Sequence, residues 1–409
     1  MSKINFRVAC LTLILGAWQI AFALTFVVLD HPSFYNEIFT GLALFLLGIF
    51  SMKWPYLRWW IAIVGIWIEF APLALWAHDA SVYLNDIFIG ALAIIFAFWF
   101  VQQEKLSERS IAPKGWSYNP SAWPHRIATA SLAFLCWSFS RYMAAYQLGY
   151  IAAVYDPFFP EGTLHVITSI VSRHIPVSDA GLGAFAYTLE FLLGWQGGQT
   201  RWMRMPWLVF SFAFLIIPVG MVSIFLIILQ PVIVGAWCSW CLFTAACMLF
   251  MIVLTAAEFA AVLQFLGQCK ARGESLWKTF WRGGNDGEEH VSSHRFAQGM
   301  SLLWNLVLSV GIGVWLMISP AITTINPFMA VSNYIVGPLI ISTSIISSAE
   351  VFRSFRYLNV LFGVECMVVS AVFGASIALH VILGIILIAL AFPKGSIKER
   401  YGAWERLIY

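Results

Sequence analysis

The stretch PVIVGAWCSWCLFTAACMLF, residues 231–250, places two cysteines three positions apart inside an apolar run. On a helix, Cys238 and Cys241 share one face and lie close enough for a disulfide across one turn. If the helix begins near Gly235, after Pro231 has closed the previous hairpin, both thiols fall in its first two turns. There, unpaired backbone N–H groups and the helix dipole favour the thiolate, the form that carries out exchange chemistry. The spacing therefore predicts a redox-active thiol pair at the start of a helix.

The composition of the whole chain is that of a membrane protein. Of its 409 residues, 61% are hydrophobic and 11% are charged, against roughly 25% charged in soluble domains. Apolar runs of about 20 residues, the length that crosses the hydrocarbon core as a helix, recur along almost the whole chain. We predict an all-α integral membrane protein with about twelve transmembrane helices and no soluble catalytic domain. The predicted spans are 8–29, 37–52, 56–77, 82–101, 127–153, 180–195, 207–230, 235–263, 299–319, 329–348, 355–375 and 377–392.

The positions of the basic residues predict the orientation in the membrane. With the N-terminus in the cytoplasm, every Lys and Arg falls on the cytoplasmic side except Arg141, inside a span, and Arg173, in an outer loop. This bias follows the positive-inside rule. An even number of spans returns the C-terminus to the cytoplasm, and it puts Cys238 and Cys241 near the outer, oxidising end of the eighth span. The expected location is the inner (cytoplasmic) membrane of a bacterium, with the thiol pair near the periplasmic or extracellular side.

Two polar linkers divide the predicted spans into three blocks of four. The linkers run from about Gln102 to His125 and from about Gln268 to His294. The predicted domains are residues 1–105, 106–270 and 290–409.

The two outer blocks share a sequence motif. Residues 65–72 read GIWIEFAP and residues 313–320 read GVWLMISP, and in both cases an Asn follows the Pro by 13 positions, at Asn85 and Asn333. Weaker echoes, in which an Asn shortly precedes a Gly that opens an apolar run, suggest a two-helix unit that is used several times. The pattern resembles the SPW-repeat membrane module. This resemblance implies an architecture of four-helix membrane modules on both sides of the central block, and it implies no chemistry.

The central block resembles the vitamin K epoxide reductase family over roughly residues 128–265. The stretch GAWCSWCLFTAACML lies at the outer end of the fourth helix of a four-helix block, after a long outer loop and a helix with AYTLEFLLG. In that family the motif cysteines form the active-site disulfide beside a quinone, and electrons pass between the thiols and the quinone. By this resemblance, Cys241 is the cysteine nearest the quinone and Cys238 exchanges with an outside disulfide. The stretch from Ser178 is similar to the family's second helix, where Asp179 stands at the position of an Asn that hydrogen-bonds the quinone.

The chain departs from the family pattern at two places. The outer loop from Tyr155, which resembles the lid over the family's pocket, lacks the two cysteines that usually pass electrons to the motif pair. Many members also have a quinone-binding Tyr four residues after the second motif cysteine, and this chain has Ala245 there. We therefore expect electrons to be exchanged with a separate thiol or disulfide partner protein, or with a small dithiol, on the outer side.

Further residues are expected to line the pocket. Arg141 and Glu190 lie inside predicted spans, where an isolated charge costs at least ~2.5 kcal/mol, so we expect them to form an ion pair. The pair is either structural or polarises a quinone oxygen. Asp179 either stabilises a developing oxyanion or serves as the N-cap of the sixth span. The expected pocket walls are Phe185, Tyr187, Trp237 and Trp240.

The alternative for Cys238 and Cys241 is a purely structural role, in which both cysteines pack as small hydrophobic residues. A zinc site would need further Cys or His ligands on the same side, and the sequence offers none. His290 and His294 have the i, i+4 spacing of a metal pair but lie in a linker without further ligands. We predict no metal site and no nucleic-acid partner.

The predicted function is that of a membrane thiol/disulfide oxidoreductase that couples the Cys238–Cys241 pair to a membrane quinone, menaquinone or ubiquinone. Its expected partners are the quinone, the thiol or disulfide partner on the outer side, and the lipid bilayer. One alternative is a non-enzymatic membrane module that binds a quinone or another hydrophobic ligand, which the cysteine-free loop and Ala245 would favour. A transporter is the other alternative, because of the internal repeat.

Overall fold

Each of the twelve predicted spans coincides with a helix in the structure, a computed structural model that describes residues 3–27, 31–77, 79–99, 111–284, 288–289, 298–373 and 377–408. These helices are α1 (Lys3–Phe26), α2 (Pro32–Ser51), α3 (Arg58–Ala74), α4 (Ala80–Trp99), α5 (Trp123–Gln147), α8 (Asp179–Trp195), α10 (Pro206–Leu229), α11 (Ser239–Ala271), α13 (Trp304–Ile322), α14 (Pro327–Ile346), α15 (Leu358–Phe373) and α16 (Ile377–Ala391). The shorter elements are η1 (Pro55–Leu57), β1 (Ile111–Ala112), α6 (Gly162–Ile167), α7 (Ile170–Arg173), α9 (Arg201–Arg204), η2 (Gln230–Val234), α12 (Leu276–Arg282), β2 (Glu288–Glu289), η3 (Glu350–Tyr357), η4 (Gly402–Trp404) and α17 (Glu405–Ile408). The two short strands pair antiparallel, with Ile111 opposite Glu289.

The helices identify a membrane protein. Within the described ranges, nine helical stretches are long and apolar enough to cross a membrane, judged by length and composition. Three long helices are not among them, because α5 is more polar, α8 has 17 residues and α16 has 15. The chain is therefore an all-helical, multi-pass membrane protein, as predicted. The number of twelve crossings stays a prediction.

The chain divides into two compact units. The first contains Met1–Leu106, Trp137–Asp156 and Ile167–Leu192, and the second contains the remainder up to Tyr409. Helices α5 and α8 each contribute residues to both units. The division into three predicted domains stays a prediction, and the two units are described separately below.

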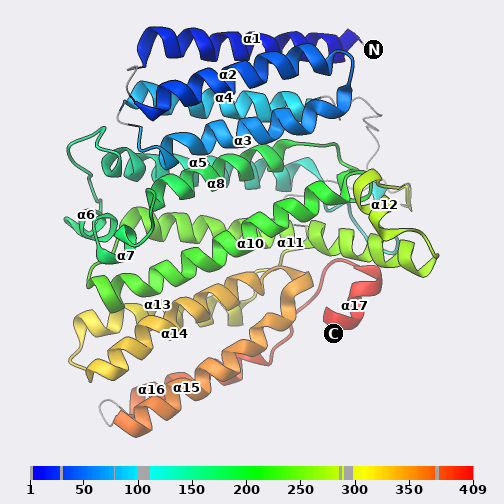
Figure 1. The fold of residues 1–409 in the computed structure, drawn as a ribbon. Coiled ribbons are helices and arrows are strands. Elements are labelled where there is room, and N and C mark those ends of the chain that lie inside the picture. Colours follow the sequence, from blue (N-terminus) through cyan, green and yellow to red (C-terminus); the bar gives the residue numbers. More distant parts are fainter. Residues whose placement is uncertain are drawn as a thin grey trace. The chain divides into compact units, whose positions relative to one another are not determined.

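Helices α1 to α4, blue to cyan in Figure 1, form a ring of neighbours in the first unit. Helix α1 packs against α2 and α3 against α4, and the contacts of α2 with α3 and of α1 with α4 close the ring. In the second unit, the yellow and orange helices α13 to α16 repeat this pattern. There, α13 packs against α14 and α15 against α16, while α14 contacts α15 and α13 contacts α16.

A pair of glycines lies at the crossing of the two helices in each of these hairpins. A Cβ on Gly65 would lie 2.9 Å from the carbonyl oxygen of Gly90, and a Cβ on Gly313 would lie 2.8 Å from that of Gly337. Small residues let the backbones of membrane helices approach this closely. The other two hairpins have the equivalent pairs Gly16 with Gly41 and Gly363 with Gly384. Gly65 and Gly313 open the two motifs GIWIEFAP and GVWLMISP, so the sequence repeat marks the same packing position in both blocks.

Several polar side chains inside the first ring hydrogen-bond to one another. The Gln19 amide donates to the Glu37 carboxylate and, at 2.9 Å, to Asp86. In addition, Asn85 donates to the Gln19 carbonyl oxygen at 3.0 Å and accepts from the indole of Trp18 at 2.9 Å. Hydrogen bonding of this kind offsets the cost of placing polar groups among apolar helices.

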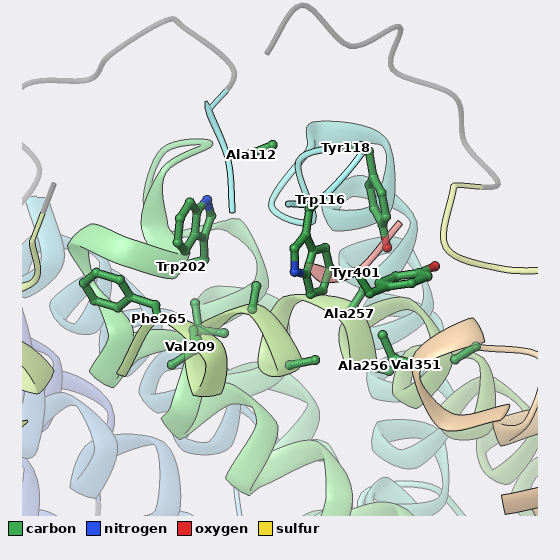
Figure 2. Close-up of a cluster of buried hydrophobic side chains, with 14 of the residues drawn as sticks. Ala112, Trp116, Tyr118, Trp202, Val209, Ala256, Ala257, Phe265, Val351 and Tyr401 are labelled. Carbon is green, nitrogen blue, oxygen red and sulfur yellow. The ribbon is translucent and has the colours of Figure 1, made fainter. Parts of the chain in front are cut away.

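In the second unit, α10 packs against α11, whose 33 residues extend beyond the predicted span 235–263. A buried aromatic cluster surrounds the C-terminal part of α11 (Figure 2). Trp116 and Tyr401 meet edge to face with ring centroids 5.0 Å apart, and the Trp116 indole donates to Gln264 at 3.0 Å. The Tyr401 hydroxyl donates to Glu350 at 2.9 Å. Burial is the main effect that raises the pKa of Tyr401 above its usual range, and the neighbouring Tyr118 phenol raises it further.

Two buried arginines hold the chain at the end of α8. The Arg126 guanidinium donates to the carbonyl oxygens of Gly194 at 3.1 Å and Gln196 at 2.9 Å. Arg201 donates to the same two carbonyl oxygens at 3.0 Å and forms an ion pair with Glu258 at 2.5 Å. Cations at a helix C-terminus bind its unpaired carbonyl groups and oppose its dipole.

Candidate thiol site

The backbone before α11 fixes the position of the two cysteines. Helix α10 continues into the π-helical segment η2 and ends at Gly235, whose φ of 71° is left-handed. Glycine adopts this conformation without the steric cost that a Cβ would bring. Helix α11 therefore begins at Ser239, four residues later than expected, and Cys238 is its N-cap with an extended backbone. The Cys238 N–H donates to the Gln230 side-chain oxygen at 3.0 Å, which ties the cap to the π-helical segment.

Hydrogen-bond donors converge on the sulfur of Cys238. Its Sγ accepts from the backbone N–H of Cys241 at 3.2 Å and from the hydroxyl of Thr163 at 3.4 Å. The Cys238 side chain is 0% exposed, whereas Cys241 is half-buried. The helix N-terminus and the two donors each stabilise negative charge on the Cys238 sulfur, and they oppose the effect of its burial. The contact between the two cysteines follows from their spacing, while the contact with Thr163 lies outside what local spacing predicts.

Part of the loop between α5 and α8 lies directly on this turn. Helix α6 begins at Gly162, and a Cβ there would overlap the carbonyl oxygen of Trp237. Phe158 and Phe243 pack with ring centroids 6.0 Å apart. The close approach at Gly162 brings the fully buried Thr163 to the Cys238 sulfur.

The two predicted wall residues next to the cysteines face different neighbours. Trp237 packs edge to face against Tyr334 of α14, with centroids 5.9 Å apart. Trp240 packs against Phe243 at 6.2 Å. In the second unit the structure thus gathers Trp237, Cys238, Trp240 and Cys241 on one turn.

The other predicted site residues belong to the first unit. Asp179 is the first residue of α8, and the helix is capped by Ser178, whose hydroxyl accepts the Gly181 N–H at 2.9 Å. The expected N-cap role of Asp179 is therefore wrong by one residue. Its carboxylate instead accepts hydrogen bonds from Gln147 at 2.5 Å and Ser172 at 3.0 Å, which hold α8 to α5 and to α7.

The expected ion pair between Arg141 and Glu190 is not formed. The Arg141 guanidinium lies over the rings of Trp137, at 4.9 Å, and Tyr83, at 5.8 Å. Glu190 is 0% exposed, and neither of its carboxylate oxygens has a hydrogen-bond partner among the residues that the structure describes.

The register of α5 against α8 explains why the two charges do not meet. Gln147 lies beside Asp179, and Ser140 lies beside Gly183, so the helices run antiparallel. The part of α5 that lies opposite Glu190 of α8 is consequently about six residues, or roughly 9 Å along the helix, away from Arg141.

Two aromatic residues of α8 complete the predicted set. Phe185 packs against Phe70 of α3 with centroids 5.6 Å apart, and Tyr187 is buried at 4% exposure. In the first unit the predicted residues Arg141, Asp179, Tyr187 and Glu190 thus occupy separate positions along α5 and α8.

The structure contains a second thiol contact that was not predicted from the sequence. The thiol of Cys247 on α11 hydrogen-bonds to that of Cys136 on α5, and the Cys136 sulfur donates to the Thr244 carbonyl oxygen at 3.7 Å. Cys247 follows Cys238 by nine residues, which on a helix is about half a turn away around the axis. Its actual neighbour lies on another helix, which spacing along one helix does not reveal.

Metal ligands are not clustered within the part of the chain that the structure describes, where no group of three or more His, Cys, Asp or Glu side chains could hold an ion. His290 and His294 lie outside the described residues.

The comparisons with known proteins agree with the central resemblance. Residues 127–256 match the model of the Vitamin K epoxide reductase family. Comparisons with curated proteins and with solved structures gave no match. The family match does not reach the outer blocks, for which the SPW-repeat resemblance stays a prediction. In general terms the match supports a membrane thiol/disulfide oxidoreductase. The matched region contains most of α5, all of α8 and α10, and the cysteine-bearing part of α11, so it is this central third of the chain that is similar to the Vitamin K epoxide reductase family.

Proposed function

We propose that the chain is a membrane enzyme in which Cys238 and Cys241, the motif pair, exchange two electrons with a lipid-soluble quinone such as menaquinone or ubiquinone. The observation that carries the proposal is the capped sulfur of Cys238. It lies at the N-terminus of α11, where the Cys241 N–H and the Thr163 hydroxyl both donate to it. A thiolate held in this way is poised for disulfide exchange.

The two cysteines have different roles in this proposal. Cys241 is the more exposed sulfur and meets the quinone ring. Cys238, buried and stabilised as the thiolate, resolves the reaction by bonding to the Cys241 sulfur. Counted from the dithiol, the S–H bonds of Cys238 and Cys241 break, the first of them when the Cys238 thiolate forms. One S–S bond forms, and two electrons and two protons convert the quinone to the hydroquinone. In the opposite direction the hydroquinone gives up two electrons and two protons and becomes the quinone, while the Cys238–Cys241 bond breaks and two S–H bonds form. The dithiol can then reduce a disulfide of the outer partner by thiol–disulfide exchange.

The cycle needs a second thiol or disulfide reactant, because the loop over the site carries no cysteine. We place this partner, a protein or a small dithiol, on the outer side of the bacterial inner membrane. Since Cys238 is covered by Thr163 and the start of α6, the residues around Gly162 must move before an outside disulfide reaches its sulfur.

The polar residues on α5 and α8 complete the proposal for the quinone side. In the first unit, Asp179 and Arg141 are proposed to bind or polarise quinone oxygens, with Tyr187 as an apolar wall residue. In the second unit, Trp237 and Trp240 are proposed as apolar wall residues beside the motif pair. Glu190 is proposed to exchange the protons that accompany the electrons, since its buried carboxyl has no hydrogen-bond partner among the described residues. Carboxyl groups without a counter-charge are neutral in an apolar environment and therefore carry a transferable proton.

The test measures reduction of a short-chain quinone by the purified, dithiol-reduced protein. Cys238→Ser and Cys241→Ser should each lower the rate on the order of 100-fold or more, because the two sulfurs act as a unit. Cys10→Ser is the matched control, since Cys10 is half-buried in an apolar helix like Cys241 but lies on α1. Full activity in either motif variant would refute the proposal and favour a ligand-binding module without turnover.

A further inference from the structure

We propose that Cys136 and Cys247, the inner thiol pair, form a second redox-active dithiol that closes to a disulfide between α5 and α11. The two thiols hydrogen-bond to each other, and the Cys136 sulfur also contacts the Thr244 carbonyl oxygen one turn before Cys247. Thiols in such contact need only a small approach to reach the roughly 2 Å of an S–S bond. None of the seven cysteines of the chain, all of them described by the structure, is in a disulfide.

The inner pair repeats the asymmetry of the motif pair. Cys136 is 0% exposed and Cys247 is half-buried, just as Cys238 is 0% exposed and Cys241 is half-buried. In each pair, one sulfur is thus partly accessible to a reactant and the other is sequestered with hydrogen-bond partners. A membrane-soluble oxidant that approaches α11 from the apolar side would meet Cys247 first.

The two pairs are too far apart for direct exchange along α11. Cys247 follows Cys241 by six residues, which corresponds to a rise of about 9 Å and to about one and two-thirds turns of the helix. A sulfur cannot attack a disulfide over that distance. The inner pair must therefore react with a diffusible carrier rather than with the motif pair itself.

The chemistry of the inner pair balances with a quinone as the oxidant. The two S–H bonds break, the Cys136–Cys247 bond forms, and the quinone takes up two electrons and two protons to become the hydroquinone. The inference rests on the proposed function only in naming a quinone as the oxidant. The contact between the two thiols is independent of it. Oxidation would link α5 covalently to α11 and remove their freedom to separate.

The test uses the full chain in lipid nanodiscs with the double substitution Cys238→Ser/Cys241→Ser. The reduced protein is incubated without oxygen with a short-chain ubiquinone, then alkylated and digested for mass spectrometry. We expect the alkylated forms of Cys136 and Cys247 to disappear and a linked peptide, lighter by two hydrogens than the sum of its parts, to take their place. A further Cys247→Ser substitution should abolish the linked peptide and leave Cys136 alkylated.

The wild-type chain is treated in parallel, which covers the case that the double variant does not fold. In it, Cys269 and Cys366 should stay alkylated and serve as internal controls. If the quinone oxidises the motif pair while the inner pair stays alkylated, the inference is wrong and the proposed function stands. If the inner pair closes while the motif pair stays reduced, the inference holds and the proposed function is wrong. Alkylation of all the thiols after incubation would overturn both.

Discussion

Thr163 provides the most direct test of how the thiol site works. Its hydroxyl donates to the Cys238 sulfur at 3.4 Å, and the side chain is fully buried. Thr163→Val removes the donor and keeps the branched shape. Thr163→Ser keeps the donor and removes a methyl group, and it is the matched control.

The size of the effect follows from the kind of hydrogen bond. A hydrogen bond to a charged group contributes roughly 1.5–3 kcal/mol. The Cys238 sulfur keeps a second donor, the Cys241 N–H at 3.2 Å, so we expect the lower end of this range. About 1.4 kcal/mol corresponds to one pH unit in a titration. Because the lost bond stabilises the charged form, the thiolate of Cys238 should appear about one pH unit higher in Thr163→Val.

The assay is a pH titration of the ultraviolet absorbance of the thiolate in the reduced protein. Subtracting the same titration of the corresponding Cys238→Ser protein isolates the contribution of Cys238. Thr163→Ser should titrate close to the wild type. An unchanged midpoint in Thr163→Val, in a protein that melts at the wild-type temperature, would refute the role assigned to this hydroxyl.

Three further predictions concern packing. Gly313→Ala should lower the free energy of unfolding by about 1–3 kcal/mol, because its Cβ would meet the facing backbone. The control Gly311→Ala, with open space around it, should be neutral or stabilise by up to about 1 kcal/mol. Equal melting temperatures of the two variants would contradict the close helix crossing at Gly313. Gly162→Ala should displace α6 from the cysteine turn and speed alkylation of Cys238, and an unchanged alkylation rate would show that the close approach is dispensable. Arg201→Met should lower the free energy of unfolding by about 3–5 kcal/mol, because it leaves Glu258 buried without its ion-pair partner. The double variant Arg201→Met/Glu258→Leu should lose less. A double variant at least as unstable as the single one would show that the unpaired Glu258 is not the cause of the loss.

Local features of the chain were predictable from its sequence. The hydropathy of each run is a property of consecutive residues, and all twelve predicted spans coincide with helices. The three-residue spacing of Cys238 and Cys241 likewise implies a contact within one helix, and the structure has the Cys241 N–H on the Cys238 sulfur. The start of the helix differs, because the left-handed Gly235 ends the preceding π-helical turn instead of opening α11, and its end lies at Ala271 instead of residue 263.

Contacts between helices were not predictable in the same way. The pairing of Arg141 with Glu190 was inferred from cost alone, yet the antiparallel register of α5 and α8 separates them, and aromatic rings surround Arg141 instead. The contact of Cys136 with Cys247 and that of Thr163 with Cys238 depend in the same way on how separate segments are aligned. A single sequence carries hydropathy and periodicity, but it does not carry this alignment.

The aromatic cluster at the far end of α11 bears on the order in which the protein is made. Gln264 is held both by Trp116, far upstream, and by the backbone N–H of Ala403, while the Trp404 indole donates to the Ala260 carbonyl oxygen at 2.8 Å. A nascent chain therefore cannot seal this end until the ribosome has released residues 401–404. Until then, Gln264 has only its upstream partners, Trp116 and the Lys114 carbonyl oxygen. A fusion tag placed after these residues should therefore be attached through a spacer that leaves the contacts of Ala403 and Trp404 undisturbed.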